Sequence, residues 1–262
     1  MQNAAPDTTE DNFLDARLRI RQPRRGYRAG LDAVLLASAV HLGAGSRGIE
    51  AGCGPGAALL CAARLNEAAR FLGVEREDQA LGLCADNILA NGLQDRCEVR
   101  KGDIADRFVR LGLSPFDAAF SNPPFFDDHR TLRAPAPERR AAWMADDGLE
   151  AWTRFLLGCV REGGEILIIH RADRLGDLLG LLAPKAGSFQ ILPVHPFADA
   201  PAKRVIVRAI KTGKAPLRLL PGLVLHERPE GGEDDGSPRP PVFSARTDAI
   251  LRGRERITWL RP

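Results

Sequence analysis

The stretch Gly48-Ile49-Glu50-Ala51-Gly52-Cys53-Gly54-Pro55-Gly56 is followed by an apolar, alanine-rich run over residues 57–69. A short strand, a glycine-dense turn and a helix start are the parts of the first βα unit of a nucleotide-binding fold. Glycines at such a turn let the backbone approach a ligand closely. The sequence therefore predicts a strand that ends in a ligand-binding turn.

Two cofactor classes fit this turn. Residues 52–57 also match the G-x-G-x-x-A pattern of NAD-binding folds, and Glu75 lies near the expected distance of a ribose-binding acid. Two details favour S-adenosylmethionine. Glu50 precedes the first glycine and can meet the ammonium group of that cofactor, and Gly56 completes a G-x-G-x-G pattern.

The next two strands are expected to end in acids. Strand 70–75 ends at Glu75, which is placed to accept from both ribose hydroxyls or is a solvated strand end. A helix over 78–91 ends at Asn91-Gly92, a left-handed cap. Strand 97–101 leads to Asp103, which is placed to accept from the adenine amino group of the cofactor or to cap a helix that starts at Ile104.

A fourth strand, 116–120, runs into Ser121-Asn122-Pro123-Pro124-Phe125. Two prolines have a fixed φ and no N–H, so the strand ends and the chain turns rigidly. The Asn122 side chain and the next carbonyl are acceptors that can hold an NH₂ group, while Phe125 stacks on a planar substrate. The alternative is an ordinary strand-ending turn. The predicted catalytic residues are Asn122, Pro123, Pro124 and Phe125.

Together these motifs resemble the class I S-adenosylmethionine methyltransferases that modify exocyclic or amide nitrogens. Residues 22–37 and 201–208 are similar to segments of the bacterial valine-tRNA N(6)-adenine methyltransferases, and the resemblance covers most of 13–225. It implies that residues 27–32 lie over the methionine end of the cofactor. The predicted cofactor-binding residues are Glu50, Gly52, Gly54, Gly56, Glu75, Asp103 and Asn122.

The rest of the chain completes an α/β fold, a doubly wound, seven-stranded Rossmann-like methyltransferase sheet in one domain with a short N-terminal arm. Helices are predicted over 149–161 and 171–182, and strands over 165–170, 188–195 and 204–210. We expect residues 1–12 to be disordered, 13–262 to form the methyltransferase domain, and 228–241 to be a mobile surface loop. The ligand should bind at the carboxyl ends of the strands.

Positive charge is concentrated although the net charge is only +3. Residues 17–28 hold six arginines and no acid, and Leu18 and Ile20 alternate with three of them. Residues 203–218 hold six more cations without an acid. If these segments share a face they form a track for RNA phosphates; the alternative is scattered solvated arginines. The predicted RNA-binding residues are Arg24, Arg25, Arg28, Arg139, Arg140, Lys203 and Arg204.

Composition excludes several classes. No apolar run is long enough to span a membrane, and the polar N-terminus has no signal pattern, so we expect a cytoplasmic protein. Five dispersed cysteines fit a reducing compartment, and no His, Cys and carboxylate spacing suggests a metal. The oligomeric state cannot be read from the sequence.

The sequence thus predicts an S-adenosylmethionine-dependent N-methyltransferase that acts on the exocyclic amino group of adenine in RNA, with tRNA as the expected substrate. Three alternatives stay open at this point. They are a guanine amino-methyltransferase of ribosomal RNA, a glutamine-N methyltransferase acting on a protein, and an inactive RNA-binding module with the same fold.

Overall fold

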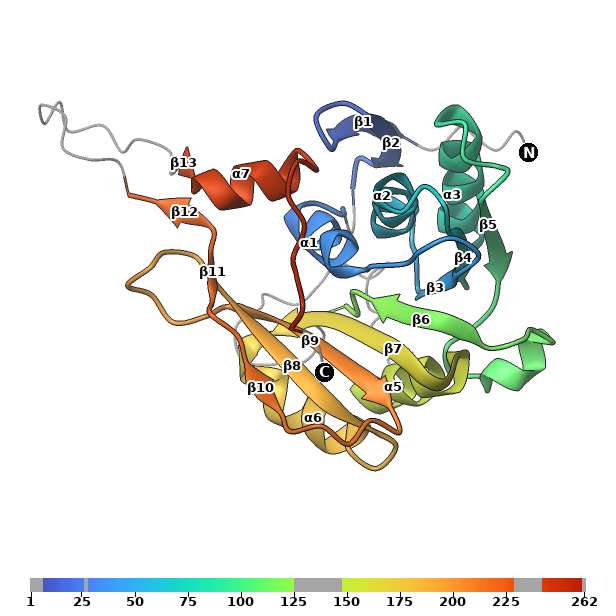
Figure 1. Ribbon diagram of the computed structural model, residues 1–262. Helices are drawn as coiled ribbons and strands as arrows, with labels where there is room; N and C mark the ends of the chain where they lie inside the picture. Colours follow the sequence, from blue (N-terminus) through green and yellow to red (C-terminus); the bar gives the residue numbers. More distant parts are fainter. Residues whose placement is uncertain (1–6, 26–27, 125–147, 229–241, 261–262) are drawn as a thin grey trace, which may run out of the picture.

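The computed structural model describes residues 7–25, 28–124, 148–228 and 242–260. Its main sheet has the order β5-β4-β3-β6-β7-β9-β8, and two further short strands pair with β8 (Figure 1). The long strands are β3 (Arg47–Ala51), β4 (Arg70–Glu75), β5 (Cys97–Lys101), β6 (Phe116–Ser121), β7 (Val160–Arg171), β8 (Ala186–His195) and β9 (Arg204–Lys211). The short ones are β10 (Arg218–Leu219) and β11 (Leu223–Val224).

The pairing is parallel except at β9, which is antiparallel to β7 and to β8. The predicted doubly wound α/β sheet is confirmed, with the seven expected strands and two short additions that make nine. Because β9 runs the other way, its first residue, Arg204, lies at the edge where the parallel strands end and pairs with Arg171.

Helices cover both faces of the sheet (Figure 1). One face carries α1 (Leu31–Ala39), α2 (Ala57–Leu65), α3 (Asp78–Ala90) and α7 (Ala245–Leu251). The other carries α5 (Gly148–Cys159), α6 (Leu175–Leu182) and the 3₁₀ turns η1 (Phe108–Leu111) and η2 (Ala172–Arg174). The alanine-rich run after the glycine turn is buried from 57 to 63, since its small side chains let α2 pack closely on the sheet.

The N-terminal arm is a β-hairpin of β1 (Thr8–Phe13) and β2 (Leu18–Pro23). The expectation of a disordered segment through residue 12 is therefore wrong for residues 8–12, because the partner strand satisfies their backbone groups. Leu18 and Ile20 are buried while Arg19 and Arg21 are exposed, as the alternation predicts.

Asn87 of α3 and Asn91, the residue directly after this helix, hold the outer edge of the hairpin. Asn87 accepts from the Arg21 amide at 2.8 Å and donates to the Arg21 carbonyl at 2.9 Å. Asn91 makes the same pair with Arg19, at 2.9 and 2.7 Å. These side-chain amides bond the backbone of β2 as a neighbouring strand would, so the edge of the hairpin is paired rather than open.

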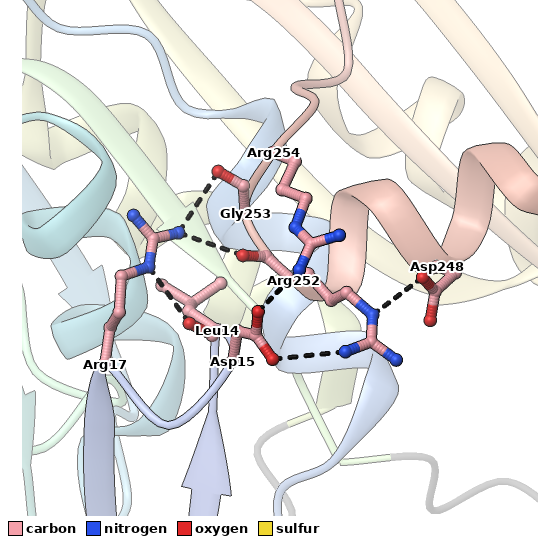
Figure 2. Close-up of polar contacts among 7 residues, drawn as sticks. All are labelled: Leu14, Asp15, Arg17, Asp248, Arg252, Gly253 and Arg254. Atoms are coloured by element: carbon pink, nitrogen blue, oxygen red, sulfur yellow. Dashed lines mark hydrogen bonds and ion pairs between the residues drawn. The ribbon is translucent and has the colours of Figure 1, made fainter.

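The tip of the hairpin packs against the C-terminal end of the fold (Figure 2). Leu14, Asp15 and Ala16 have φ values of +52°, +61° and +60°, a conformation that costs free energy in non-glycine residues. Arg17 donates to the carbonyls of Leu14, Arg252 and Gly253 at 3.0, 3.0 and 3.1 Å. Asp15 also ion-pairs with two C-terminal arginines, Arg252 and Arg254, so the tip is fixed by contacts from beyond α7.

The segment after α7 also caps two helices. Arg256 donates to the Ser38 carbonyl at 3.1 Å, the Leu65 carbonyl at 2.7 Å, and the Val40 carbonyl. These are C-terminal carbonyls of α1 and α2 that have no partner within their helices. A guanidinium at two helix C-termini also suits their partial negative charge.

Other boundaries differ slightly from expectation. Strand β7 begins at Val160 rather than 165, with a register shift between Phe116 and Ala118 on β6. Gly92 adopts φ +65° after α3, as the predicted cap requires. Most of the predicted loop 228–241 lies outside the described residues, between β12 (His226–Glu227) and β13 (Val242–Phe243).

Candidate active site

Four of the predicted motifs meet at one edge of the sheet. In the parallel register Ala51 pairs with Val74, Glu75 with Lys101, and Glu50 with Phe120. The ends of β3, β4, β5 and β6 are therefore neighbours, as the predicted strand order requires. The acids, the glycine turn and the Asn-Pro-Pro segment share the carboxyl edge.

All three glycines of the turn have positive φ, +64° at Gly52, +54° at Gly54 and +90° at Gly56. A Cβ at Gly52 would lie 2.2 Å from the Trp152 indole of α5, and one at Gly56 would lie 2.7 Å from Cys84 Sγ. A Cβ at Gly54 would meet no described residue within 4 Å. Gly52 and Gly56 are thus required by packing as well as by conformation, whereas Gly54 has room beside it among the residues that the structure describes.

Glu50 is buried, with 3% of its surface exposed. Among the described residues its Oε2 has no hydrogen-bond partner. Burial raises the pKa of this carboxyl well above its ordinary value, helped by the nearby Cys84 and Glu75. A buried acceptor without a donor beside a glycine turn fits a cationic ligand group such as an ammonium.

Glu75 is not a solvated strand end. Its Oε2 accepts from the Gly54 amide at 2.9 Å, and its Oε1 accepts from the amides of Arg76 and Glu77 at 2.8 and 3.0 Å. The residue is 9% exposed, and its carboxylate joins the end of β4 to the glycine turn. Its predicted bond to ribose hydroxyls stays a prediction, and the three amides fix the orientation that such a bond would need.

Asp103 closes a turn rather than capping a helix. Its Oδ1 accepts from the Ala105 amide at 2.9 Å, and no helix starts at Ile104, since the next helical turn, η1, begins at Phe108. The local side-chain bond offers the backbone an alternative to helix formation. Oδ2 lies 3.8 Å from Arg76 Nη1. The adenine contact predicted for Asp103 remains a prediction.

Strand β6 ends at Ser121, where the double proline predicts its end. Asn122 and Pro124 are half-buried and Pro123 is buried, whereas Phe125 lies outside the described residues. Ser121 is fully buried, and its hydroxyl donates to the Ala51 carbonyl at 2.8 Å. Asn122 thus follows a residue that is bonded directly to the strand before the glycine turn.

The lead-in to α1 is held by a residue that we did not predict. Gln22 is buried, donates to the Ala29 carbonyl at 3.1 Å, and accepts from the Ala29 amide at 2.8 Å. Arg28 ion-pairs with Asp11 at 2.7 Å. Gln22 follows Leu18 and Ile20 on the buried face of β2, and that alternation could have identified it as a buried polar residue.

The charge pattern differs from what the sequence suggests, because acids lie beside several of the arginines. Glu10 of β1 lies 3.9 Å from Arg19 and 4.0 Å from Arg21 of β2. Arg24 pairs with Asp7 at 2.7 Å, and Arg204 pairs with Asp32 at 3.1 Å. Arg25 and Lys203 are exposed and have no ion-pair partner in the described parts of the chain. Arg139 and Arg140 lie outside those parts.

The Asp32–Arg204 pair also brings the two softer segments of the resemblance together. Asp32 lies in the first turn of α1, within the segment 22–37, and Arg204 begins β9 in the segment 201–208. Both therefore lie at the carboxyl edge. Across the described residues there is no cluster of His, Cys, Asp and Glu that could hold a metal ion, and no helix there is long and apolar enough to cross a membrane.

Comparison with known proteins agrees with this geometry. A model of the family described as "Methyltransferase domain" matches residues 42–146. The rRNA N(6)-adenosine-methyltransferase metl-5 of Caenorhabditis elegans is 41% identical over 130 residues, 49% of this chain and 53% of that protein. A tRNA1(Val) (adenine(37)-N6)-methyltransferase of Actinobacillus succinogenes is 32% identical over 166 residues, 63% of this chain and 69% of that protein.

A release factor glutamine methyltransferase of Gloeobacter violaceus is 32% identical over 149 residues, 53% of this chain and 51% of that protein. The chain thus spans about half the length of the worm and Gloeobacter relatives. Among solved structures, a predicted O-methyltransferase from Agrobacterium tumefaciens superimposes with a TM-score of 0.69 and 26% identity, covering 86% of this chain and 98% of that one.

The sheet order, the motifs at its carboxyl edge and these matches show that the chain belongs to the family of S-adenosylmethionine-dependent methyltransferases that includes the tRNA1(Val) (adenine(37)-N6)-methyltransferases. S-adenosylmethionine is the cofactor of this class. The residues present fit it: in the described parts of the chain Glu50 offers a buried Oε2 without a donor, and Gly54 has no side chain near its Cα hydrogen.

Proposed function

We propose that the protein methylates the exocyclic amino group of adenine in RNA, and that tRNA is the RNA. The observation that carries the proposal is the position of Asn122. It directly follows Ser121, which is hydrogen-bonded to Ala51, the residue before the glycine turn. The acceptors of the Asn-Pro-Pro segment therefore adjoin the turn that is proposed to hold the methyl donor.

When bound, S-adenosylmethionine supplies an electrophilic methyl group whose bond to sulfur breaks with its electron pair on sulfur. The task of the protein is to prepare the nucleophile. The lone pair of an exocyclic adenine nitrogen is delocalised into the ring. The Asn122 side-chain oxygen and the Pro123 carbonyl would accept hydrogen bonds from its two N–H groups, favour a pyramidal nitrogen, and direct the lone pair at the methyl carbon.

Cofactor and base would be held by separate groups. Glu50 would accept from the ammonium group, Glu75 from the ribose, and Asp103 from the adenine amino group of the cofactor. Phe125 would stack on the acceptor base after it is turned out of its RNA loop. The nitrogen that has been methylated becomes acidic, so its proton can leave to water without a dedicated base.

The choice of RNA is supported by the relatives and by two exposed cations. Two of the relatives reported above are named for N6 methylation of adenine in rRNA and tRNA. Lys203 lies beside Arg204 at the carboxyl edge, and Arg25 precedes the lead-in to α1. Both are available for phosphate contacts, whereas Arg24, Arg28 and Arg204 already have acidic partners. A cytoplasmic location stays a prediction.

Transfer of labelled methyl into unmodified tRNA, ribosomal RNA and a protein extract, assayed in parallel, tests the proposal. Digestion of the product should release N(6)-methyladenosine from tRNA. Label in N(6)-methyladenosine from ribosomal RNA would keep the reaction and change the substrate. Label in guanosine or in glutamine would replace the proposed acceptor, and no label in any pool despite cofactor binding would favour an inactive RNA-binding module.

A further inference from the structure

Ser121 connects the two strands that carry the chemistry. It is the last residue of β6, none of its surface is exposed, and its hydroxyl donates to the carbonyl of Ala51, the last residue of β3, at 2.8 Å. Gly52 directly follows Ala51 after β3, and Asn122 directly follows Ser121 after β6. The bond therefore spans the point at which the proposed cofactor turn and the proposed acceptor segment diverge.

The backbone register explains what this hydroxyl adds. Pairing between β3 and β6 runs from Gly48–Ala118 to Glu50–Phe120 and ends there. On its other side Ser121 pairs with Ile168 of β7. The side chain thus extends the contact between β3 and β6 by one residue, at the position where both strands leave the sheet.

We propose that Ser121 is a positioning residue for methyl transfer: its bond to Ala51 sets the distance between the Asn122 acceptors and the glycine turn. This inference rests on the proposed function, because it assigns Ser121 a role through Asn122. In-line transfer depends steeply on alignment, and a displacement of about 1 Å can lower a rate on the order of 100-fold. Loss of the hydroxyl should therefore lower turnover more than it weakens binding.

The chain offers a matched control in α1. Ser38 is also fully buried, and its hydroxyl also donates to a carbonyl at 2.8 Å, that of Leu35. Ser38 lies near the C-terminal end of α1, whereas Asp32 lies in the first turn of this helix. Ser38 is therefore away from the carboxyl edge of the sheet. Ser121→Ala and Ser38→Ala each remove one buried hydroxyl, but only the first lies between the two motifs.

The experiment compares the wild type, Ser121→Ala, Ser38→Ala and Ser121→Thr, using whichever acceptor the wild type methylates. We expect kcat of Ser121→Ala to fall about 10- to 100-fold, while the calorimetric Kd for S-adenosylhomocysteine changes less than about 3-fold. Ser38→Ala should keep the wild-type kcat, and Ser121→Thr should recover most of the loss. Equal kcat in the two alanine variants would overturn the proposal.

A second measurement needs no acceptor, so it separates this inference from the proposed function. With S-adenosylhomocysteine bound, the ¹⁵N-labelled side-chain amide of Asn122 should give one set of resonances in the wild type and in Ser38→Ala, and a broadened or doubled set in Ser121→Ala. An unchanged Asn122 signal in Ser121→Ala would refute the positioning role. A wild type that methylates no RNA would refute the proposed function instead.

Discussion

The carboxylate of Glu75 accepts a hydrogen bond from the Gly54 amide at 2.9 Å, so the end of β4 holds the turn that follows β3. Glu75→Gln would replace one acceptor oxygen by a donor that faces backbone amides. Bonds to a charged group contribute about 1.5–3 kcal/mol, so the affinity for S-adenosylmethionine should fall about 10- to 100-fold by calorimetry. The exposed neighbour Glu77→Gln is the control. Equal affinities in the two variants would show that Glu75 does not take part in binding.

Gly52→Ala should be more harmful than Gly54→Ala. Both residues have positive φ, which costs about 1–2 kcal/mol with a side chain, but only at Gly52 would the new methyl meet an indole, that of Trp152. Urea unfolding should therefore show a larger loss of stability for Gly52→Ala. Gly82→Ala in α3, where nothing lies within 4 Å, should stabilise the protein slightly. Similar losses at Gly52 and Gly54 would contradict the packing argument.

Asn122→Ala should separate chemistry from cofactor binding. Removal of one preorganised group at a reacting centre typically costs about 100- to 1,000-fold in rate, and we expect methyl transfer to fall by that much. The Kd for S-adenosylmethionine should stay close to the wild-type value. The control is Asn12→Ala, at an exposed position of β1, and its Kd should also stay close to the wild-type value. Loss of cofactor binding, or unchanged turnover, would exclude the role assigned to Asn122.

Charge reversal at Lys203 should weaken RNA binding. Lys203 and Lys185 lie beyond opposite ends of the ten-residue strand β8, about 33 Å apart along the strand, and only Lys203 is at the carboxyl edge. Lys203→Glu should reduce the slope of log K against log salt by about one, whereas Lys185→Glu should leave the slope unchanged. Equal effects of the two reversals would remove Lys203 from the proposed RNA surface.

His170 predicts a pH dependence of stability. Burial, with help from Arg171 and Arg204, lowers its pKa from 6.5 to about 4. The unfolded chain therefore binds this proton at a higher pH than the folded chain does. The contribution to the free energy of unfolding, about 3 kcal/mol, is complete above pH 6.5 and is lost as the pH falls toward 4. The raised pKa of Glu50 acts in the opposite direction, so the measurable quantity is the difference between wild type and His170→Gln in urea unfolding. A difference that is constant with pH would refute the assignment.

The sheet and the motifs at its carboxyl edge can be predicted from the sequence because they depend on local patterns. Apolar runs give the strands, glycines give the turn, and the double proline ends β6. The hairpin strand β1 was missed because Thr8–Phe13 has little apolar alternation; its stability comes from pairing with β2 and from opposite charges such as Asp11 and Arg28.

Long-range polar contacts were missed for a related reason. Ser121 and Ala51 are 70 positions apart, and the sequence around neither residue indicates that they form a hydrogen bond. The pairing of Arg24 with Asp7 likewise depends on the fold of the hairpin, which brings an acid beside a segment that contains none. Sequence patterns predict which motifs lie at the carboxyl edge, whereas the contacts that fix their orientation depend on the order of the strands.

The contact between Arg17 and Arg252 has a consequence for biosynthesis, since the two residues are 235 positions apart. At a translation rate of about 5–20 residues per second, the ribosome needs roughly 12–47 s to reach Arg252 after it has made Arg17. During that time the tip of the hairpin, with three residues in a costly conformation, has none of its C-terminal partners. The tip of this hairpin therefore gains these contacts only after all the strands of the main sheet have been made.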